Sequence, residues 1–459
     1  MFLLACVGVV LEKEVEFTLI FVVITTLVFA LPQNGLRALY PAMLMCCIAI
    51  KCYNSFDTFI KFFYVPIPII IIAIVKICKG IKEYRTGDSL FGVTAVAVAV
   101  TLGGIGTISA KEYFSPTSIY YILALGVGMV LFYLAARYGI FKSDVDSFKL
   151  FSVIMYIIGL FCMFEVIHLY AAYHEMIFYK GRLLFAGVPH IDQLMNRKFQ
   201  ISNNISTIMM FCLPFPFYYA VKKHSAHIFV GFAMLGCMYL TTSRSAMLMG
   251  SIEALVCIIY ACIYKRKLII HTLATLAVGI IVIIAYPPLL KFVSYYISMD
   301  KLKNLITYGE ARVKLISRAI VDFRGNPIFG QGLGNVDNTD LYNPKKGAMV
   351  FYHMFIPQVV GSLGAVGIIA YGHQIIERVR LIFKNITAES TCLGISYLGI
   401  FLMSQVNPGE FCPIPYEMIT VMLFIFLEKM LADKELFIYP GKSKCISEFL
   451  GKKQNSKQM

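Results

Sequence analysis

Three basic residues of this chain, Arg244, Arg312 and His353, have side chains with complementary chemistry. A guanidinium is permanently charged and its forked donors match phosphate oxygens, whereas an imidazole can take up a proton near neutral pH. Each residue also has a plainer interpretation, because Arg244 could reach lipid headgroups and His353 could pack inside the protein. If all three share one face of a membrane, the combination indicates an enzyme.

The segments around these residues are long enough to cross a membrane. Arg244 ends Thr241-Thr242-Ser243-Arg244, a polar break between two apolar runs. Arg312 lies in a long polar stretch, and His353 opens the next apolar run. A guanidinium beside a bilayer is costly to place, so it usually has an anionic partner or a functional task.

The composition excludes a soluble globule. Of the 459 residues, 59% are hydrophobic and 15% are charged. Windows of the roughly 17 to 25 apolar residues that a helix needs to cross hydrocarbon recur along the chain, which excludes a membrane barrel. We therefore predict an all-α polytopic integral membrane protein with about 12 or 13 transmembrane helices. The apolar runs lie near residues 17–32, 36–51, 62–78, 90–108, 118–137, 149–171, 203–221, 226–241, 244–263, 268–287, 350–371, 388–406 and 414–431.

The formal charge of +15 reflects membrane topology rather than nucleic-acid binding, because Lys and Arg gather between the apolar runs. Alternate connections are basic, which predicts that they are cytoplasmic. They contain Lys76, Lys79, Lys82 and Arg85; Arg137, Lys142 and Lys149; Lys222 and Lys223; Lys265, Arg266 and Lys267; and Arg378, Arg380 and Lys384. The opposite connections then face outward, and Arg244, Arg312 and His353 share that face.

Four segments follow from this topology. Residues 1–287 hold the first ten helices, 288–349 form a large outer loop, 350–432 hold three more helices, and 433–459 form a basic cytoplasmic tail. The outer loop carries nine Lys and Arg against five acids. This excess indicates an anionic ligand, but long outer loops also escape the charge rule, so both interpretations stay open.

The first 32 residues are ambiguous. Residues 1–11 are apolar, but the run is short and lacks a basic leader, so no cleaved signal peptide is expected. Whether residues 1–32 form one helix or two is left open.

The outer loop contains a predicted amphipathic helix at 311–324, lying on the outer surface. Val313, Ile316, Ile320 and Phe323 share one face of it, and Lys314 and Arg318 lie elsewhere, one turn apart. Asn326-Pro327 ends the helix, and the glycines at 330–334 turn the chain back. That turn is either a structural bend or an anion-binding loop. No strand precedes it and no Gly-Lys-Ser/Thr follows, which argues against a nucleotide fold.

Other ionisable residues lie at membrane depth. Glu165, His168 and Glu253 either pair inside the bundle or support the outer site. His373 lies too deep for outward chemistry. The cysteines are scattered through apolar runs without metal-ligand spacing, which is typical of core residues.

The order and spacing of these motifs resemble the O-antigen ligase and O-antigen polymerase superfamily of bacterial cell-surface glycan enzymes. The resemblance covers roughly residues 180–372. Its pieces, in chain order, are Ser243-Arg244 opening a helix, Arg312 heading a loop helix, the Asn326-Pro327 to Gly334 turn, and His353 followed by Gly364 and Gly367.

The chain also departs from the family pattern. The ligase motif has Asn, Ser or Gln directly after the histidine, and Met354 stands there. Members usually have a Trp shortly after the loop arginine, whereas this chain has no Trp and Leu315 or Ile316 takes the place. Asn203-Asn204 is similar to the asparagine-containing start of the helix before Ser-Arg. The Met354 departure favours a polymerase over a ligase.

The resemblance implies metal-independent glycosyl transfer at the outer leaflet of the bacterial inner membrane. The donor would be an undecaprenyl-diphosphate-linked oligosaccharide, and the acceptor a second lipid-linked glycan or a lipid A core sugar. Arg244 and Arg312 would hold the diphosphate and stabilise the leaving group, and His353 would orient or deprotonate the acceptor. Arg318 and Lys314 are further candidates for substrate binding. No cofactor is expected, because the donor is already activated.

Other functions remain in competition with polymerisation. A ligase would transfer the finished glycan to lipid A core, and a protein O-oligosaccharyltransferase resembles the same superfamily. A lipid-linked glycan flippase predicts internal repeats and charges that line a midplane cavity. The chain shows no evident repeat, and its distinctive cations gather at one predicted surface.

Overall fold

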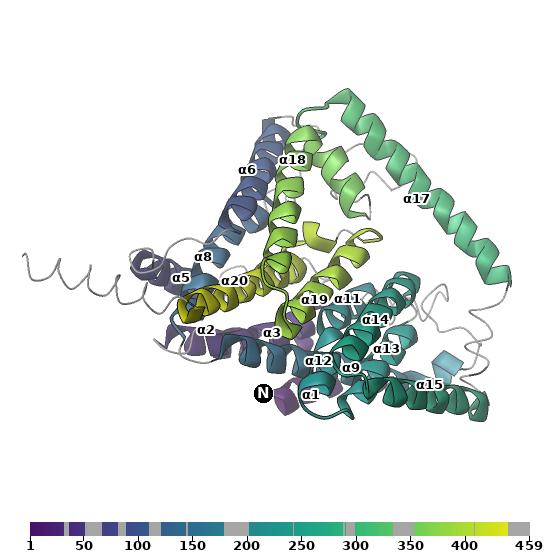
Figure 1. Ribbon diagram of the computed structural model, residues 1–459. Coiled ribbons are helices and arrows are strands. Elements are labelled where there is room, and N and C mark those ends of the chain that lie inside the picture. Colours follow the sequence, from purple (N-terminus) through teal and green to yellow (C-terminus); the bar gives the residue numbers. More distant parts are fainter. Residues whose placement is uncertain are drawn as a thin grey trace, which may run out of the picture.

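A computed structural model describes residues 1–31, 36–50, 67–80, 89–109, 121–143, 146–178, 202–241, 243–287, 290, 299–333, 352, 354–407 and 409–438. Every regular element in these ranges is helical (Figure 1). The elements are α1 (Phe2–Val10), α2 (Glu14–Ala30), η1 (Leu36–Ala38), α3 (Leu39–Ile50), α5 (Ile67–Gly80), α6 (Leu90–Ser109), η3 (Ile122–Gly128), α8 (Met129–Phe141), α9 (Ser147–Phe178), α11 (Ser202–Cys212), α12 (Pro214–Lys222), α13 (His227–Leu240), α14 (Arg244–Tyr264), α15 (Leu268–Ala285), α17 (Met299–Gly325), α18 (Phe355–Lys384), α19 (Ala388–Ser404), η5 (Gly409–Phe411), η6 (Pro413–Glu417) and α20 (Met418–Ile438).

The helices confirm the predicted fold class, an all-α polytopic membrane protein. Six of the described spans are long and apolar enough to cross a membrane, and four shorter apolar helices accompany them. The long spans are Ile122–Phe141, Ser147–Ala171, Asn203–Lys222, Ser245–Tyr264, Leu268–Ala285 and Phe355–Lys384. The N-terminal ambiguity is resolved, because α1 and α2 are separate helices joined at Glu12, whose φ is 56°.

The main departure from the predicted runs concerns residues 350–371, which the sequence predicts as one continuous helix. Gly364 has φ 59° and ψ −148°, so α18 bends there. The ring centroids of Phe355 and Tyr371 are 5.1 Å apart, although sixteen residues of straight helix would separate them by about 24 Å. The segment is therefore folded into a short arm, Phe355–Leu363, that lies against a long arm, Ala365–Lys384.

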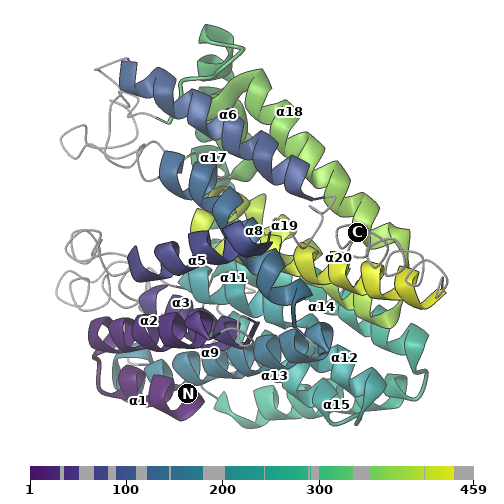
Figure 2. The same cartoon turned by 90° about the vertical axis from the view of Figure 1, so that its left-hand side faces the viewer.

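The two arms of α18 meet near the end of α17, to one side of the main bundle (Figures 1 and 2). Helix α6 lies along the long arm in both views. The amide of Gly92, near the start of α6, donates to Glu377 Oε2 at 2.8 Å. A Cβ added at Gly103, near the other end of α6, would lie 2.6 Å from Leu363 at the bend. Small residues in α6 thus let it approach α18 closely along its length.

Polar contacts join helix ends into two separate groups. At one end of the bundle, the starts of α11 and α14 meet, with 2.5 Å from Ser243 Oγ to Asn203 Oδ1. At the other end, Lys222 pairs with Glu389 at 2.9 Å, and Lys265 Nζ donates to the Ala220 carbonyl at 3.0 Å. Both lysines come from connections predicted to be cytoplasmic, and the structure brings them to the same end. Arg378, predicted to lie in another cytoplasmic connection, is instead buried inside α18, where it pairs with Glu410 from a connection predicted to face outward.

Helix α17 begins earlier than the predicted 311–324 and ends as expected, at Gly325. It packs against α18 through Leu315, Ala319 and Asp322, which are buried. The predicted apolar face does not make this contact, because Val313, Ile316 and Ile320 are exposed. The amphipathic helix is therefore present with its predicted apolar face exposed, and the placement of that face on the outer membrane surface stays a prediction. The side that packs includes an aspartate, which no apolar pattern would select.

Of the ionisable residues predicted at membrane depth, Glu165 and Glu253 are fully buried and His168 is partly buried. Glu253 faces Gly399 of α19, whose lack of a side chain leaves room for the carboxylate. His373 lies 3.5 Å from Glu377 and against the ring of Phe91. The predicted roles of Glu165, His168 and Glu253, pairing inside the bundle or support of the outer site, stay predictions.

Candidate functional site

The candidate site begins at the break between α13 and α14. Ser243 is the N-cap of α14, and its hydroxyl accepts from the amide of Ala246 at 3.3 Å. Serine suits this position because its side chain satisfies an amide that the first helical turn leaves unpaired. The same hydroxyl donates to Asn203 of α11. Arg244 is the first residue of α14, so its backbone lies at the positive end of a helix dipole, where anions are favoured.

Arg312 of α17 reaches this helix start. Its Nη2 forms a long hydrogen bond of 3.5 Å to Ser245 Oγ, one residue beyond Arg244. Arg312 is partly buried, and burial lowers the pKa of its guanidinium. No carboxylate among the described residues offsets that burial. The structure thus brings the backbone of Arg244 beside Arg312, in surroundings that would favour an anion; the Arg244 side chain lies outside the described residues.

The chain that enters α18 is tied to the same helix. The Tyr352 hydroxyl donates to Asp322 Oδ2 of α17, and Arg318 pairs with Asp322 at 3.0 Å. The Tyr352 amide donates to Gln358 Oε1 at 3.0 Å. Tyr352 and Met354 are both buried. His353 lies outside the described residues, but its two neighbours are fixed against α17 and the short arm.

The predicted site residues of α17 do not all lie on one side. The contact of Arg312 with α14 and the pair of Arg318 with Asp322 lie at different levels of the helix, because Asp322 follows Arg312 by ten residues, about 15 Å along the helix axis. Lys314 is exposed and projects about 160° away from Arg312 around the helix. The Arg318 guanidinium is engaged by Asp322. Of the three predicted cations of α17, Arg312 is therefore the one that contacts the start of α14, while Arg318 helps to hold Tyr352.

The backbone geometry explains why glycines stand at the positions that carry the family resemblance. Residues 327–331 bond along the bend of α18: the Ala365 amide to the Pro327 carbonyl at 2.9 Å, Val366 to Ile328 at 3.1 Å, and Gln331 to Gly361 at 2.8 Å. A Cβ added at Gly330 would lie 2.6 Å from the Gly361 carbonyl oxygen, and one added at Gly364 would lie 2.6 Å from the Gly330 amide nitrogen. Both residues also have positive φ, which favours glycine.

This geometry favours the structural-bend interpretation of the turn at 330–334, as far as Leu333, where the described segment ends. The Gln331 amide is used by the Gly361 carbonyl and the Gly330 amide by the Asn326 carbonyl, at 2.8 Å each. The turn is a structural bend that holds α17 to α18. At Gly367, a side chain would meet Leu363 and Val359, so this glycine lets the short arm pack on the long arm.

Sequence reasoning missed Asp322, Tyr352 and Ser245 as parts of the site. Asp322 follows Arg318 by one helical turn, a spacing typical of an ion pair, so that contact was visible in the sequence. The bond from Tyr352 to Asp322 joins residues thirty positions apart, and no periodicity reports it. Ser245 gave no signal beyond its place next to Ser243-Arg244.

The fold and the site define a class: a polytopic helical membrane protein in which a loop helix carries an arginine to the start of a second helix. Residues 229–372 match the family model described as O-antigen ligase, and this match supports the resemblance to the O-antigen ligase and polymerase superfamily. The match covers just under a third of the chain and includes Arg244, Arg312, Lys314, Arg318 and His353. No curated protein matches the chain significantly.

Proposed function

We propose that this protein is a membrane glycosyltransferase that takes oligosaccharide from an undecaprenyl-diphosphate donor at the outer face of the bacterial inner membrane. It polymerises repeat units of O-antigen or another surface polysaccharide. The observation that carries the proposal is the contact of Arg312 with Ser245, which places a desolvated guanidinium at the helix start where Arg244 stands. A helix N-terminus and two guanidinium groups together suit a diphosphate.

The proposed roles follow the chemistry of each group. Arg244 and Arg312 hold the diphosphate and stabilise the charge that develops on it as the glycosidic bond breaks. His353 orients or deprotonates the acceptor hydroxyl. Arg318 acts through Asp322, which holds Tyr352 and so the segment that carries His353. The two guanidinium groups supply the positive charge that a metal would otherwise provide, so we propose a metal-independent reaction.

The acceptor distinguishes two functions. Met354 is buried, so the position after His353 offers no amide or hydroxyl to an acceptor, which favours a polymerase. The description of the matching family model favours a ligase, which would transfer the glycan to a lipid A core sugar. Both functions use the same donor site, and the difference lies in the second substrate.

The test supplies purified protein with undecaprenyl-diphosphate oligosaccharide alone. A ladder of lengthening products is expected for a polymerase, and a ligase reacts only after a lipid A core acceptor is added. Arg244→Ala, Arg312→Ala and His353→Ala should each abolish product while still inserting into the membrane. Arg324→Ala is the matched control, because Arg324 is an exposed arginine in the last turn of α17. Product from all three site variants would refute the proposed mechanism.

A further inference from the structure

The connection between α19 and α20, residues 409–417, is buried although it is not α-helical. We refer to it as the bridging loop. It consists of the 3-10 turn η5 and the π-helical turn η6, and Glu410, Phe411, Tyr416 and Glu417 are enclosed. Gly409 has φ 45°, a conformation that glycine allows. Irregular backbone inside a membrane bundle is tolerated only where protein surrounds it, and π-helical turns often occur at functional sites.

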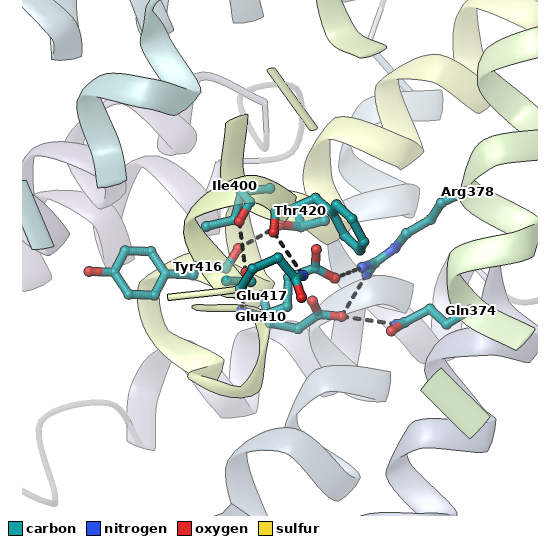
Figure 3. A network of polar contacts seen from close by, with 10 residues as sticks. Gln374, Arg378, Ile400, Glu410, Tyr416, Glu417 and Thr420 are labelled. Atoms are coloured by element: carbon teal, nitrogen blue, oxygen red, sulfur yellow. Dashed lines mark hydrogen bonds and ion pairs between the residues drawn. The ribbon is translucent and has the colours of Figure 1, made fainter. Parts of the chain in front are cut away.

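A charged cluster fixes the bridging loop to the long arm of α18 (Figure 3). Arg378 donates from Nη1 to Glu410 Oε2 at 2.6 Å and from Nη2 to Glu417 Oε1 at 2.7 Å. Gln374, one turn earlier in the long arm, donates to Glu417 Oε1 at 3.0 Å. The three charged side chains are at most 2% exposed. Removing one partner of such a cluster leaves a buried charge uncompensated.

The bridging loop touches both halves of the candidate site. On one side, the Tyr416 hydroxyl donates to Asn204 Oδ1 at 2.6 Å, next to the Asn203 that holds Ser243. Figure 3 shows the Tyr416 ring pointing away from the charged cluster. On the other side, the Phe411 ring lies 6.1 Å from Tyr371, whose ring packs on Phe355 in the short arm.

We propose that Arg378, Glu410 and Glu417 are positioning residues for glycosyl transfer. By locking the bridging loop, they set the spacing between the start of α14, which holds the donor, and the short arm, which follows His353. The inference rests on the proposed function for its chemistry. None of the three residues touches substrate in this proposal. They act through Tyr416 on one half and through Phe411 on the other.

The expected effect follows from the geometry of transfer. A donor and an acceptor that are each bound but displaced by about 1 Å react up to about 100-fold more slowly. Glu417→Gln keeps the shape of the side chain but removes the charge that Arg378 and Gln374 bind. We expect it to lower the turnover number roughly 10- to 100-fold while the donor KM changes less than about 3-fold. Tyr416→Phe, which removes one hydroxyl, should shift the same constants in the same direction by a smaller factor.

The matched control is Glu428→Gln, in helix α20, which begins directly after Glu417. Glu428 pairs with the buried Arg137 and follows Glu417 by eleven residues, about 16 Å along the chain axis. Its contacts are with α6 and α8, away from the bridging loop. We expect this variant to lose stability and to keep the turnover number of its folded fraction.

A second readout does not depend on activity. In Glu417→Gln and Tyr416→Phe, amide hydrogen exchange should rise both at residues 202–212 and at 355–363, whereas Glu428→Gln should raise it at 129–141. Unchanged exchange at either half of the site, or equal turnover in Glu417→Gln and Glu428→Gln, would overturn the inference. If exchange rises at both halves in Glu417→Gln and Tyr416→Phe while the wild type forms no product, the proposed function is refuted and the coupling of the two halves stands.

Discussion

Gly364→Ala is the substitution that most directly tests the bend of α18. The bend brings Phe355 back to Tyr371 and so determines where the chain after His353 lies. A continuous transmembrane helix, which the apolar run 350–371 predicts, would instead accept alanine at this position without strain. The same substitution therefore has opposite expected effects in the two arrangements.

The magnitude can be worked from the contacts at Gly364. A side chain at φ 59° and ψ −148° costs about 1–3 kcal/mol of backbone strain. The added Cβ would lie 2.6 Å from the Gly330 amide nitrogen and 2.7 Å from the Ile328 carbonyl oxygen, so this backbone must move apart. Two hydrogen bonds then loosen, from Ala365 and Val366 to residues 327 and 328, at about 0.5–1.5 kcal/mol each. Together these effects destabilise the fold by about 2–6 kcal/mol.

The assay compares unfolding of Gly364→Ala with that of Gly372→Ala in the same detergent. Gly372 lies in the long arm of the same helix, and an added Cβ there meets nothing within 4 Å. Alanine at Gly372 should leave stability unchanged or raise it by about 0.5–1 kcal/mol. Gly364→Ala should also lose glycan transfer, because the short arm is displaced. Equal stabilities and equal activities of the two variants would refute the bend.

Three further outcomes follow from the site and the helix ends. Arg312→Lys should raise the donor KM about tenfold or more, because an ammonium cannot donate in the forked geometry; an unchanged KM would remove Arg312 from the donor site. Tyr352→Phe should destabilise the protein by about 1–3 kcal/mol and slow transfer, because Asp322 loses a buried donor; unfolding and product formation measure the two effects. Lys222→Ala should cost at most about 1 kcal/mol and leave transfer intact, because its pair with Glu389 is partly exposed at the opposite end; a loss of transfer would contradict this sidedness.

The sequence predicts the membrane helices well because their length is set by the bilayer and their composition is local. The runs 244–263 and 268–287 correspond to α14 and α15 within a few residues. The bend in 350–371 escapes this reasoning, because an apolar run satisfies a spanning helix and a folded pair of arms equally well. Only the positive φ of Gly364 distinguishes them, and glycine also occurs in straight membrane helices.

The candidate site was predictable to the extent that charge sets topology. Counting basic connections groups Arg244 and Arg312 on one side, and the structure places their segments in contact at Ser245. Counting basic connections could not distinguish the side of α17 that faces α14 from the exposed side. Lys314 and Arg312 are both cations two residues apart, and their different surroundings depend on a face chosen by Asp322 and α18. Such a choice depends on contacts distant in sequence, which charge counting does not capture.

The two buried arginine and glutamate clusters differ in a way that bears on the role of the bridging loop. Glu428 has both carboxylate oxygens satisfied, by Ser89 and by Tyr133 and Arg137. Glu410 and Glu417 share one guanidinium, and within the described residues one oxygen of each accepts no hydrogen bond.

A cluster built only for stability would resemble the one at Glu428. Apolar residues of similar size also commonly match or exceed a buried ion pair in stability. What the Arg378 cluster supplies, and apolar packing would not, is a fixed direction for two carboxylates on a short loop. That direction sets Tyr416 towards Asn204 and Phe411 towards Tyr371. A fixed direction of this kind is what the proposed positioning of the two halves of the site requires.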